Sequence, residues 1–437
     1  MSNMATSSKS SRQGEPSSKV QLKGRLYGEE TVSIEFDKAT GIIERVEKLD
    51  ELCDEIILPG LVDLHTHLRE PGNERSETIL TGSKAAAAGG YTCVHAMANT
   101  TPAQDTASAV DKTLLQGQKI GLVEVRPVGA VTKGLEGEKL AELGLMATSM
   151  SRVRVFSDDG KCVHNPLLMR RALEYVKAFG GVVAQHAQDP VLTQHSQMNE
   201  GLLSSQLGLQ GWPAVAEESI IARDVLLART TDSHLHICHL STRGSVEIVR
   251  FAKSKGISVT AEVTPHHLTL TEQKLVEYNP RYKVNPPLRT LDDVTALREG
   301  VADRTIDIVA TDHAPHAQES KYCNFQDSAF GMTELETALS AVQLSLVDAG
   351  YISWRQVAKI MSQTPAEIGQ VAGQGQEIEV GAHANLVLYN PLLKHNVEPS
   401  QQQTASQNTP FKHYELPGMV AETYYKGKQT YSANLPR

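Results

Sequence analysis

Apolar runs alternate with segments of helical periodicity along most of this chain. Between the runs, segments such as 83–88 and 167–179 place apolar residues at helical spacing, and Gly-Gly pairs at 89–90 and 180–181 mark where helices end. This alternation predicts parallel strands joined by crossover helices. The runs with the length and composition of buried strands are residues 56–64, 91–98, 123–131, 153–157, 181–185, 235–240, 257–263 and 306–311.

Eight strands of this kind predict an α/β fold, a (β/α)8 TIM barrel, which we place at residues 58–375. The alternative is a doubly wound open sheet, which is weakened because no Gly-rich nucleotide-binding fingerprint follows any strand. Residues 19–57 and 376–437 contain short β-like runs, and we expect both chain ends to pair into one small β-sandwich domain. Residues 398–409 are predicted to be a mobile loop, and residues 1–18 a disordered Ser-rich tail.

Composition narrows the class of protein. The 437 residues are 40% hydrophobic and 21% charged, as in an ordinary globular protein. The net charge of -9 argues against a nucleic-acid partner, and no apolar run reaches the ~18 residues that span a membrane. The five cysteines are scattered and form no CxxC pair, which is typical of reduced thiols. We therefore expect a cytoplasmic protein; a transit peptide is the less favoured alternative, because the N-terminal segment has almost no apolar face.

One residue separates His65 from His67 at the end of the first predicted strand. Residues i and i+2 of a strand point to the same side, so both imidazoles can reach one point, which suits a metal ion. Arg69, two residues further on, can offer a guanidinium fork to a carboxylate at the same place. Active sites of (β/α)8 barrels form at the carboxyl ends of the strands, so polar residues that follow the other strands are the next candidates.

Those strand ends supply two carboxylates and two more histidines, namely Asp159, His186, His239 and Asp312. A single barrel histidine is more often structural than a ligand, but six candidate ligands at the same ends of successive strands predict a metal centre. Six exceed the needs of one tetrahedral zinc ion, so a carboxylate shared by two metals is expected, and Asp159 is the natural bridge. Its neighbour Asp158 is expected to cap the following turn or helix.

The other histidines are expected to be structural or to support the centre. His266 and His267 are adjacent, and adjacent residues of a strand point to opposite faces, so both cannot enter one site. His236 lies three residues before His239, and a shift of that strand would favour it as the ligand instead. The structural interpretation also applies to His95, His164, His195, His234, His313 and His383.

Six segments, in this order, resemble motifs of the class I dihydroorotases of the amidohydrolase superfamily. They are DLHTHLREPG (63–72), MANT (97–100), FSDDG (156–160), HLST (239–242), KVNPPLR (283–289) and ATDHAPH (310–316). The resemblance implies reversible hydrolysis of dihydroorotate to N-carbamoyl-aspartate in pyrimidine biosynthesis, with one or two zinc ions as cofactor. It implies one metal at His65, His67 and Asp312, a second at His186 and His239, and Asp159 as the bridge where many relatives carry a carboxylated lysine.

The resemblance also implies roles around the metals. Asp312 would be the general base and acid, and Arg69 and Asn99 would hold the substrate carboxylate. The further substrate-binding residues implied are His67, Asn285, His316, Phe330 and Gly331. Homo-oligomers and a complex with aspartate transcarbamoylase are the partners implied.

Two other functions fit a chain of this kind. A hydantoinase or allantoinase shares the fold and a related ring-opening reaction, but Arg69, Asn99 and the aspartate at 159 argue against it. A non-catalytic dihydroorotase-like subunit of aspartate transcarbamoylase is the other alternative. Such proteins tend to lose metal ligands, and none of the six candidates is missing here.

Overall fold

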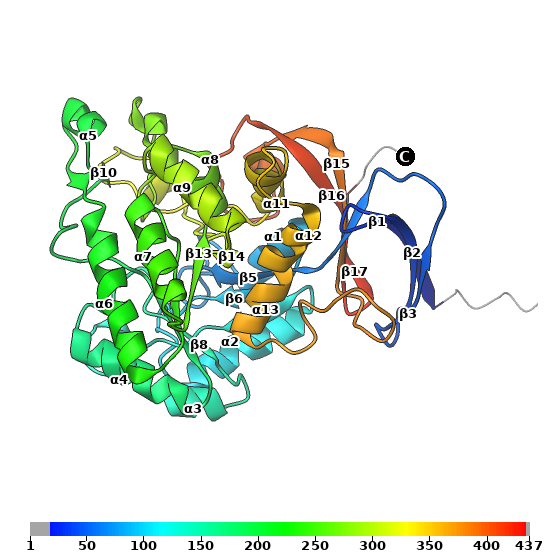
Figure 1. Cartoon of the computed structure of the whole chain (residues 1–437), viewed down its shortest axis with the longest axis horizontal. Coiled ribbons are helices and arrows are strands. Elements are labelled where there is room, and N and C mark those ends of the chain that lie inside the picture. The colour runs from blue at the N-terminus through cyan, green and yellow to red at the C-terminus, as the bar shows by residue number, and fades with distance from the viewer. Residues whose placement is uncertain (1–17, 434–437) are drawn as a thin grey trace, which may run out of the picture.

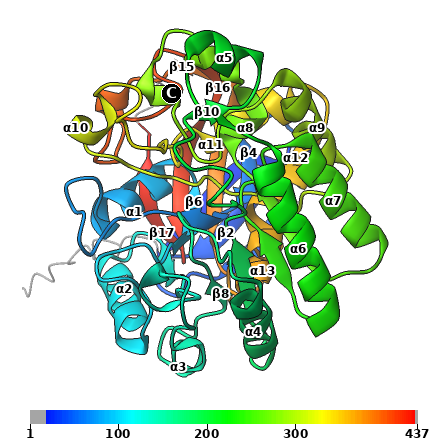
Figure 2. The ribbon, with the colours of Figure 1, turned by 90° about the vertical axis from the view of Figure 1, so that its left-hand side faces the viewer.

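The computed structural model describes residues 18–433 and contains the predicted barrel (Figures 1 and 2). Its strands form two parallel sheets, β5-β6-β7 and β14-β13-β12-β9-β8. Parallel bridges from Gly129 to Phe156 and from Thr66 to His313 join the two sheets and close the barrel. The (β/α)8 prediction is confirmed. The strands are β5 (Leu61–Thr66), β6 (Tyr91–Ala96), β7 (Glu124–Pro127), β8 (Val155–Phe156), β9 (Val182–Gln185), β12 (Leu235–Ile237), β13 (Val259–Val263) and β14 (Ile308–Val309).

Helices surround these strands, as Figure 2 shows for α2, α3, α4 and α6. The longer helices are α1 (Ile79–Ala88), α2 (Ala107–Ile120), α4 (Pro166–Lys177), α6 (Val215–Thr231), α7 (Arg243–Ser254) and α9 (Leu291–Ala302), and the six-residue α3 (Leu143–Thr148) follows β7. The shorter ones are η1 (Lys133–Leu135), α5 (Leu202–Leu207), α8 (Pro265–Thr269), η2 (Glu272–Leu275), η3 (Pro280–Tyr282), α10 (Gln318–Lys321), α11 (Ala338–Val342), η4 (Gln343–Val347), α12 (Trp354–Ala358), η5 (Lys359–Gln363), α13 (Thr364–Gly369) and η6 (Pro399–Gln401). A two-stranded sheet of β10 (Met198–Asn199) and β11 (Gly211–Trp212) lies between α4 and α6 in sequence.

Helix α4 illustrates how local sequence sets these elements. Asn165 caps its start by accepting hydrogen bonds from the backbone amides of Leu167 and Leu168, and Pro166 occupies the first helical position. Gly180, with φ of 68°, supplies the left-handed backbone that turns the chain into β9. The helix buries one apolar face, made of Leu168, Met169, Ala172, Leu173 and Val176.

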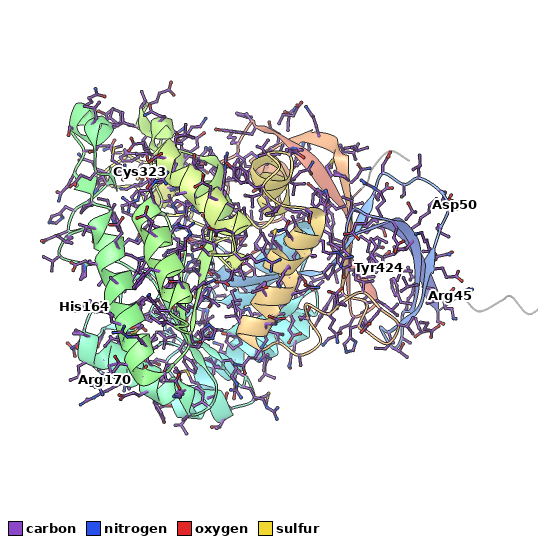
Figure 3. The ribbon with its side chains drawn as sticks, in the orientation of Figure 1. Arg45, Asp50, His164, Arg170, Cys323 and Tyr424 are labelled. Carbon is purple, nitrogen blue, oxygen red and sulfur yellow. The ribbon has the colours of Figure 1, made fainter. Side chains whose placement is uncertain are left out.

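The two chain ends form one seven-stranded sheet beside the barrel (Figure 1). Its order is β17 (Lys428–Ser432), β16 (Glu415–Tyr425), β15 (Leu386–Asn396), β4 (Ile56–Pro59), β1 (Lys19–Leu26), β2 (Thr31–Asp37) and β3 (Ile43–Lys48). Although β2 and β16 are not neighbours in this order, the rings of Phe36 and Tyr424 lie 5.2 Å apart (Figure 3 labels Tyr424). The sheet therefore folds over itself, as in a sandwich.

Two expectations from the sequence change. The predicted strand 56–64 divides at Gly60, where a side chain would collide with Thr92; β4 pairs with β15, whereas β5 enters the barrel. Residues 398–409, expected to be a mobile loop, are instead anchored to the barrel, for example by Ser406, which donates a hydrogen bond to the carbonyl of Ser76. The predicted tail at 1–18 lies outside the described residues except for Ser18. Among residues 18–433, no helix combines the length and apolarity needed to cross a membrane.

Candidate metal centre

The six predicted ligands converge at the carboxyl ends of the barrel strands. His65 is the fifth residue of β5, and each of the others follows its strand by one to three residues. All six side chains are buried. The set is His65, His67, Asp159, His186, His239 and Asp312. Spacing along the chain could not place them together, but parallel strands with a common end do.

Asp159 lies at the middle of this cluster. Its Oδ1 is 3.3 Å from His65 Nε2, 3.2 Å from His186 Nδ1 and 3.4 Å from His239 Nε2. Its Oδ2 is 3.2 Å from His67 Nε2. One carboxylate thus faces four imidazoles with both oxygens, which is the arrangement that a carboxylate shared between two cations requires.

Two overlapping groups of donors share Asp159, and in each the ligand atoms lie within 4.8 Å of one another. They are His65, His67, Asp159 and Asp312, and Asp159, His186 and His239. This division matches the one expected from the sequence. Imidazole nitrogens and carboxylate oxygens are suitable ligands for zinc and similar divalent ions.

A further observation supports a bound cation at these residues. His65 Nε2 is buried and has no hydrogen-bond partner among residues 18–433, which is costly for a polar atom unless another group takes its lone pair. Burial raises the pKa of Asp159, but the neighbouring imidazoles of His65, His186 and His239 outweigh it and hold that pKa well below its usual range. The cluster therefore offers ionised carboxylates together with a free imidazole nitrogen.

Partners behind the cluster set the orientation of its imidazoles. His65 Nδ1 donates to Glu262 Oε1 at 2.6 Å, so its Nε2 faces the cluster. His67 Nδ1 is 2.9 Å from Asn99 Oδ1 and likewise turns its Nε2 inward. Such outer hydrogen bonds fix the tautomer of a ligating histidine. Glu262 was missed from the sequence, although an acid inside the predicted buried strand 257–263 was a usable signal.

Gln188 was also missed from the sequence. Its Oε1 lies 2.8 Å from His186 Nε2 and accepts a hydrogen bond from Asn285 Nδ2 at 3.0 Å. Asn285, expected to bind substrate, thereby lies next to a predicted metal ligand. Its own Oδ1 is buried and has no hydrogen-bond partner among residues 18–433.

The expected capping role of Asp158 is corrected. Its Oδ1 accepts hydrogen bonds from the backbone amides of Val131 and Thr132, at 2.8 and 2.9 Å, in the loop after β7. The side chain is structural, as expected, but it holds the preceding strand's loop rather than the following turn. The reason is that strand ends β7 and β8 are neighbours in the closed barrel.

The neighbouring histidines remain outside the cluster. His266 and His267 lie in helix α8, not on a strand, so the reason given for separating them was wrong, although neither enters the site. His266 Nδ1 is 2.8 Å from Glu334, and His267 Nε2 is 3.1 Å from the carbonyl of Pro286. His236 contacts Glu262 rather than the cluster, which leaves His239 as the member from β12.

Arg69 lies beside the cluster, where the sequence predicted a cation. Its Nε donates to the carbonyl of Pro315 at 3.1 Å, and its Nη2 is 3.5 Å from His316 Nε2. Burial lowers the pKa of Arg69 to about 10, so the guanidinium remains charged at neutral pH. Burial, followed by the charge of Arg69, lowers the pKa of His316 to about 3, so this imidazole is neutral.

The segment Phe330 and Gly331 is held against His316. The neutral imidazole donates from Nε2 to the carbonyl of Phe330 at 2.7 Å. A Cβ on Gly331, whose φ is 143°, would meet the same nitrogen at 2.7 Å, so only glycine fits this close approach. Asn408 from the C-terminal segment binds the carbonyl of Gly331 at 3.1 Å and the amide of His316 at 3.2 Å. No local signal marked Asn408.

Three site residues have a left-handed backbone that non-glycine residues rarely adopt. The φ angles are 61° for Arg69, 30° for His239 and 47° for Asp312. Strain of this kind is kept where surrounding structure imposes it, and it concentrates at functional sites.

Comparisons with known proteins identify the family. Residues 54–245 match the family model described as Dihydro-orotase-like. The chain is 61% identical to a dihydroorotase of Leifsonia xyli over 86% of either chain. It is 62% identical to a dihydroorotase of Streptomyces coelicolor over 87% of this chain and 89% of that protein.

Solved structures support the fold. An L-hydantoinase (dihydropyrimidinase) from Arthrobacter aurescens superimposes with a TM-score of 0.81 at 21% identity and covers 93% of this chain and 94% of its own. A dihydropyrimidinase from Brevibacillus agri gives a TM-score of 0.80, also at 21% identity, over 94% of both chains. At this identity the likeness concerns the barrel and its flanking sheet alone. From its close relatives, the chain belongs to the dihydroorotase family of the amidohydrolase superfamily.

Proposed function

We propose that this protein is a dihydroorotase, which interconverts (S)-dihydroorotate and N-carbamoyl-L-aspartate with one or two zinc ions at the six-residue cluster. The observation that carries the proposal is the position of the half-buried, charged Arg69 beside the six candidate ligands. Dihydroorotate bears a carboxylate next to a cyclic ureide, so its recognition needs a cation close to the hydrolytic centre. Two relatives at 61% and 62% identity are named dihydroorotases.

A divalent ion at the cluster supplies Lewis-acid chemistry, which activates water and polarises the attacked carbonyl. Asp312 does the proton transfer in this proposal. Its Oδ1 faces His67 at 2.9 Å and His65 at 3.4 Å, whereas its Oδ2 makes no hydrogen bond within residues 18–433. Oδ2 takes the proton from the attacking water and returns it to the ring nitrogen that leaves. The reverse cyclisation uses the same groups.

The remaining residues position the substrate. Arg69 forms charge-assisted hydrogen bonds with the substrate carboxylate, and the unpaired Oδ1 of Asn285 accepts from a ring amide. Asn99, His316 and the backbone at Phe330 and Gly331 complete the contacts. Asn99 also orients His67, so its two polar atoms serve the ligand and the substrate together.

An assay on three ring substrates tests the proposal. We expect purified protein to hydrolyse dihydroorotate with kcat/KM at least about 100-fold above that for hydantoin and allantoin, because only dihydroorotate offers a carboxylate to Arg69. Preference for hydantoin or allantoin would favour the related cyclic amidases. Zinc-free protein that stays inactive after zinc is added would favour a non-catalytic subunit of aspartate transcarbamoylase.

Arg69→Met should raise KM for dihydroorotate about 10- to 100-fold, because it removes charged hydrogen bonds worth about 1.5–3 kcal/mol. Steady-state kinetics in both directions measure the effect. Arg75→Met is the matched control, since Arg75 is an exposed arginine of the same loop whose side chain pairs with Glu319, and KM should not change. An unchanged KM in the Arg69 variant would disprove the carboxylate contact.

Glu262→Gln should weaken zinc binding about 10- to 100-fold, because the variant loses the carboxylate that orients His65. Competition with a chromophoric chelator measures the zinc dissociation constant directly. Glu334→Gln is the control, since Glu334 is a buried acid beside a histidine outside the cluster. Equal zinc affinity in the two variants would show that Glu262 does not support the metal.

The assembly state and the cellular location stay predictions. Homo-oligomers, a complex with aspartate transcarbamoylase and a cytoplasmic location are the expectations from the family. Gel filtration of the protein with and without aspartate transcarbamoylase, followed by activity measurements on each peak, tests both assemblies.

A further inference from the structure

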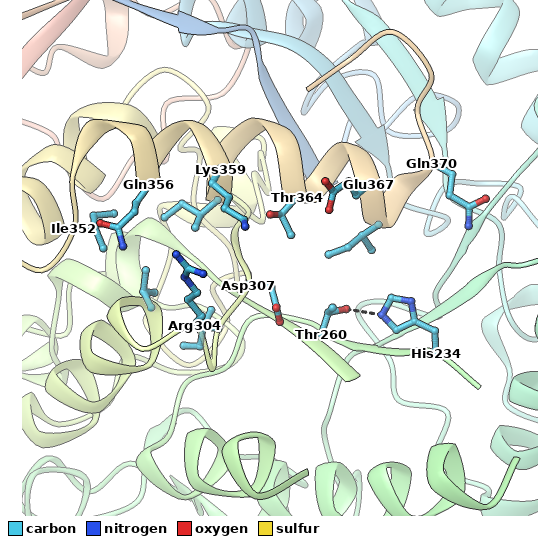
Figure 4. A pocket seen from close by; sticks show the side chains of 14 residues that line it. His234, Thr260, Arg304, Asp307, Ile352, Gln356, Lys359, Thr364, Glu367 and Gln370 are labelled. Carbon is cyan, nitrogen blue, oxygen red and sulfur yellow. Dashed lines mark hydrogen bonds between the residues drawn. The ribbon is translucent and has the colours of Figure 1, made fainter. Parts of the chain in front are cut away.

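A cavity of about 430 Å³ lies at the opposite end of the barrel from the metal cluster (Figure 4). His234 directly precedes β12, and Asp307 directly precedes β14, so both wall residues lie at the amino ends of these strands. The cluster members His239 and Asp312 follow the same two strands at their carboxyl ends. The volume falls within the range of about 300–1,000 Å³ that is common for small-molecule sites.

The wall combines apolar side chains with two cations. Figure 4 shows the guanidinium of Arg304 and the ammonium of Lys359 extending into the cavity from opposite walls. Both residues are exposed, and neither side chain forms an ion pair or hydrogen bond within residues 18–433. The apolar lining comes from Val301, Ile306, Ile352, Ile360 and Ile368.

Acidic residues do not neutralise these cations. Asp307 is engaged by Lys253, whose Nζ lies 2.6 Å from its Oδ2, and it also accepts from the amide of Ala261. Glu367 lines the cavity without a hydrogen bond or ion pair within residues 18–433. Two cations and two carboxylates thus line the cavity, and Lys253, which is outside the lining, already pairs with one of the carboxylates. A ligand that suits this cavity has an anionic group and an apolar body. The anionic group would lie between Arg304 and Lys359, and the apolar body would pack on the isoleucine wall.

A column of hydrogen bonds connects this cavity to the metal cluster through the barrel interior. His234 Nε2 is 2.9 Å from Thr260 Oγ1, which is 2.9 Å from His236 Nδ1. His236 Nε2 is 3.1 Å from Glu262 Oε2, and Glu262 Oε1 is 2.6 Å from His65 Nδ1. His236 and Thr260 are paired across β12 and β13, so the two strands carry the column side by side.

With a neutral imidazole at His236, one direction of donors satisfies every member of this column. Glu262 accepts from both His65 and His236, so the Nδ1 of His236 accepts from the hydroxyl of Thr260. That hydroxyl in turn accepts from His234 Nε2. Barrel interiors are normally filled by branched apolar side chains, and a polar network placed there is ordered only when it is fully satisfied.

We propose that the cavity binds a small organic anion, a phosphate or carboxylate on an apolar body, and that this binding is coupled through the column to His65. The binding does not depend on the function proposed above. The coupling rests on the proposed function, because the coupling requires a metal at the cluster.

Calorimetry on the full chain tests the binding, with phenyl phosphate and benzoate as probes. We expect phenyl phosphate and benzoate both to bind, each at least tenfold more tightly than benzyl alcohol. Arg304→Gln combined with Lys359→Gln should weaken the anions at least tenfold, whereas Arg304→Lys should stay within threefold. Arg170→Gln, an exposed arginine far from the cavity (Figure 3), is the surface control. No binding of either anion, or equal binding by the double variant, overturns the site.

The coupling is measured as linkage, without an activity assay. If two sites are coupled, zinc and phenyl phosphate change each other's affinity by the same factor. We expect the phenyl phosphate dissociation constant of zinc-loaded protein to differ at least fivefold from that of chelator-stripped protein. Thr260→Val, which removes the hydroxyl between His234 and His236, should bring this ratio close to one, and Thr260→Ser should preserve it.

Equal dissociation constants in zinc-loaded and stripped wild-type protein would overturn the coupling. A protein that takes up no zinc would contradict the proposed function and the coupling together, while the calorimetric comparison of the cavity variants would still decide the binding site. The two proposals therefore fail in different measurements.

Discussion

Replacing Asp312 with Asn is expected to lower kcat at least about 1,000-fold in both reaction directions. General acid–base catalysis contributes about 10²- to 10⁴-fold, and an amide cannot take a proton from water and return it to the leaving nitrogen. The same change also removes a negative charge that faces His65 and His67. Single-turnover and steady-state measurements with dihydroorotate and with N-carbamoyl-aspartate give the size of the loss.

The zinc content of the Asp312→Asn protein must be measured alongside its kinetics. Full zinc occupancy with a collapsed kcat would assign the proton transfer to Asp312, whereas a loss of zinc would point to ligation. Asp303→Asn is the matched control, because Asp303 is an aspartate of the same region that pairs with Arg250 outside the site. Normal turnover by the Asp312 variant with bound zinc would exclude its proposed role.

Removing the metal is expected to reduce activity to the background rate, and added zinc should restore it. The proposed ligands are four imidazoles and two carboxylates, a set that favours zinc and similar ions over magnesium. Incubation with dipicolinate, followed by metal analysis and assay, measures the loss. Magnesium should not restore activity, because it prefers oxygen ligands and keeps its water shell.

The fold should survive this treatment, which separates a catalytic metal from a structural one. The barrel interior has its own apolar core, made of Leu64, Met97, Val128, Val155, Val182, Ala184, Cys238, Ile308, Ala310 and Ile368. Far-ultraviolet circular dichroism and the melting cooperativity should therefore change little. Full activity in stripped protein of verified metal content would rule out a metal mechanism.

Much of the fold could be predicted because its signals are local. Seven of the eight barrel strands lie within a predicted apolar run, and β5 runs two residues past its own, to Thr66, since burial on both faces requires continuous apolar sequence. The short repeat from His65 to His67 indicated a shared metal, and the rule that barrel sites form at carboxyl strand ends brought in Asp159 and Asp312. The first inference needs only the period of a strand, and the second needs the predicted barrel as well.

Other features depend on contacts that no local pattern records. His65 and Glu262 are separated by 197 positions, and their hydrogen bond exists only because barrel closure brings β5 and β13 together. Asn408 reaches His316 from a segment expected to be mobile. The sequence by itself determined the strands, their order and the chemical types at their ends. Only the tertiary structure decided which imidazole each carboxylate faces. It also placed a polar column between the cluster and a cavity at the far end of the barrel. The reason is that side-chain partners across a closed barrel follow from its three-dimensional register.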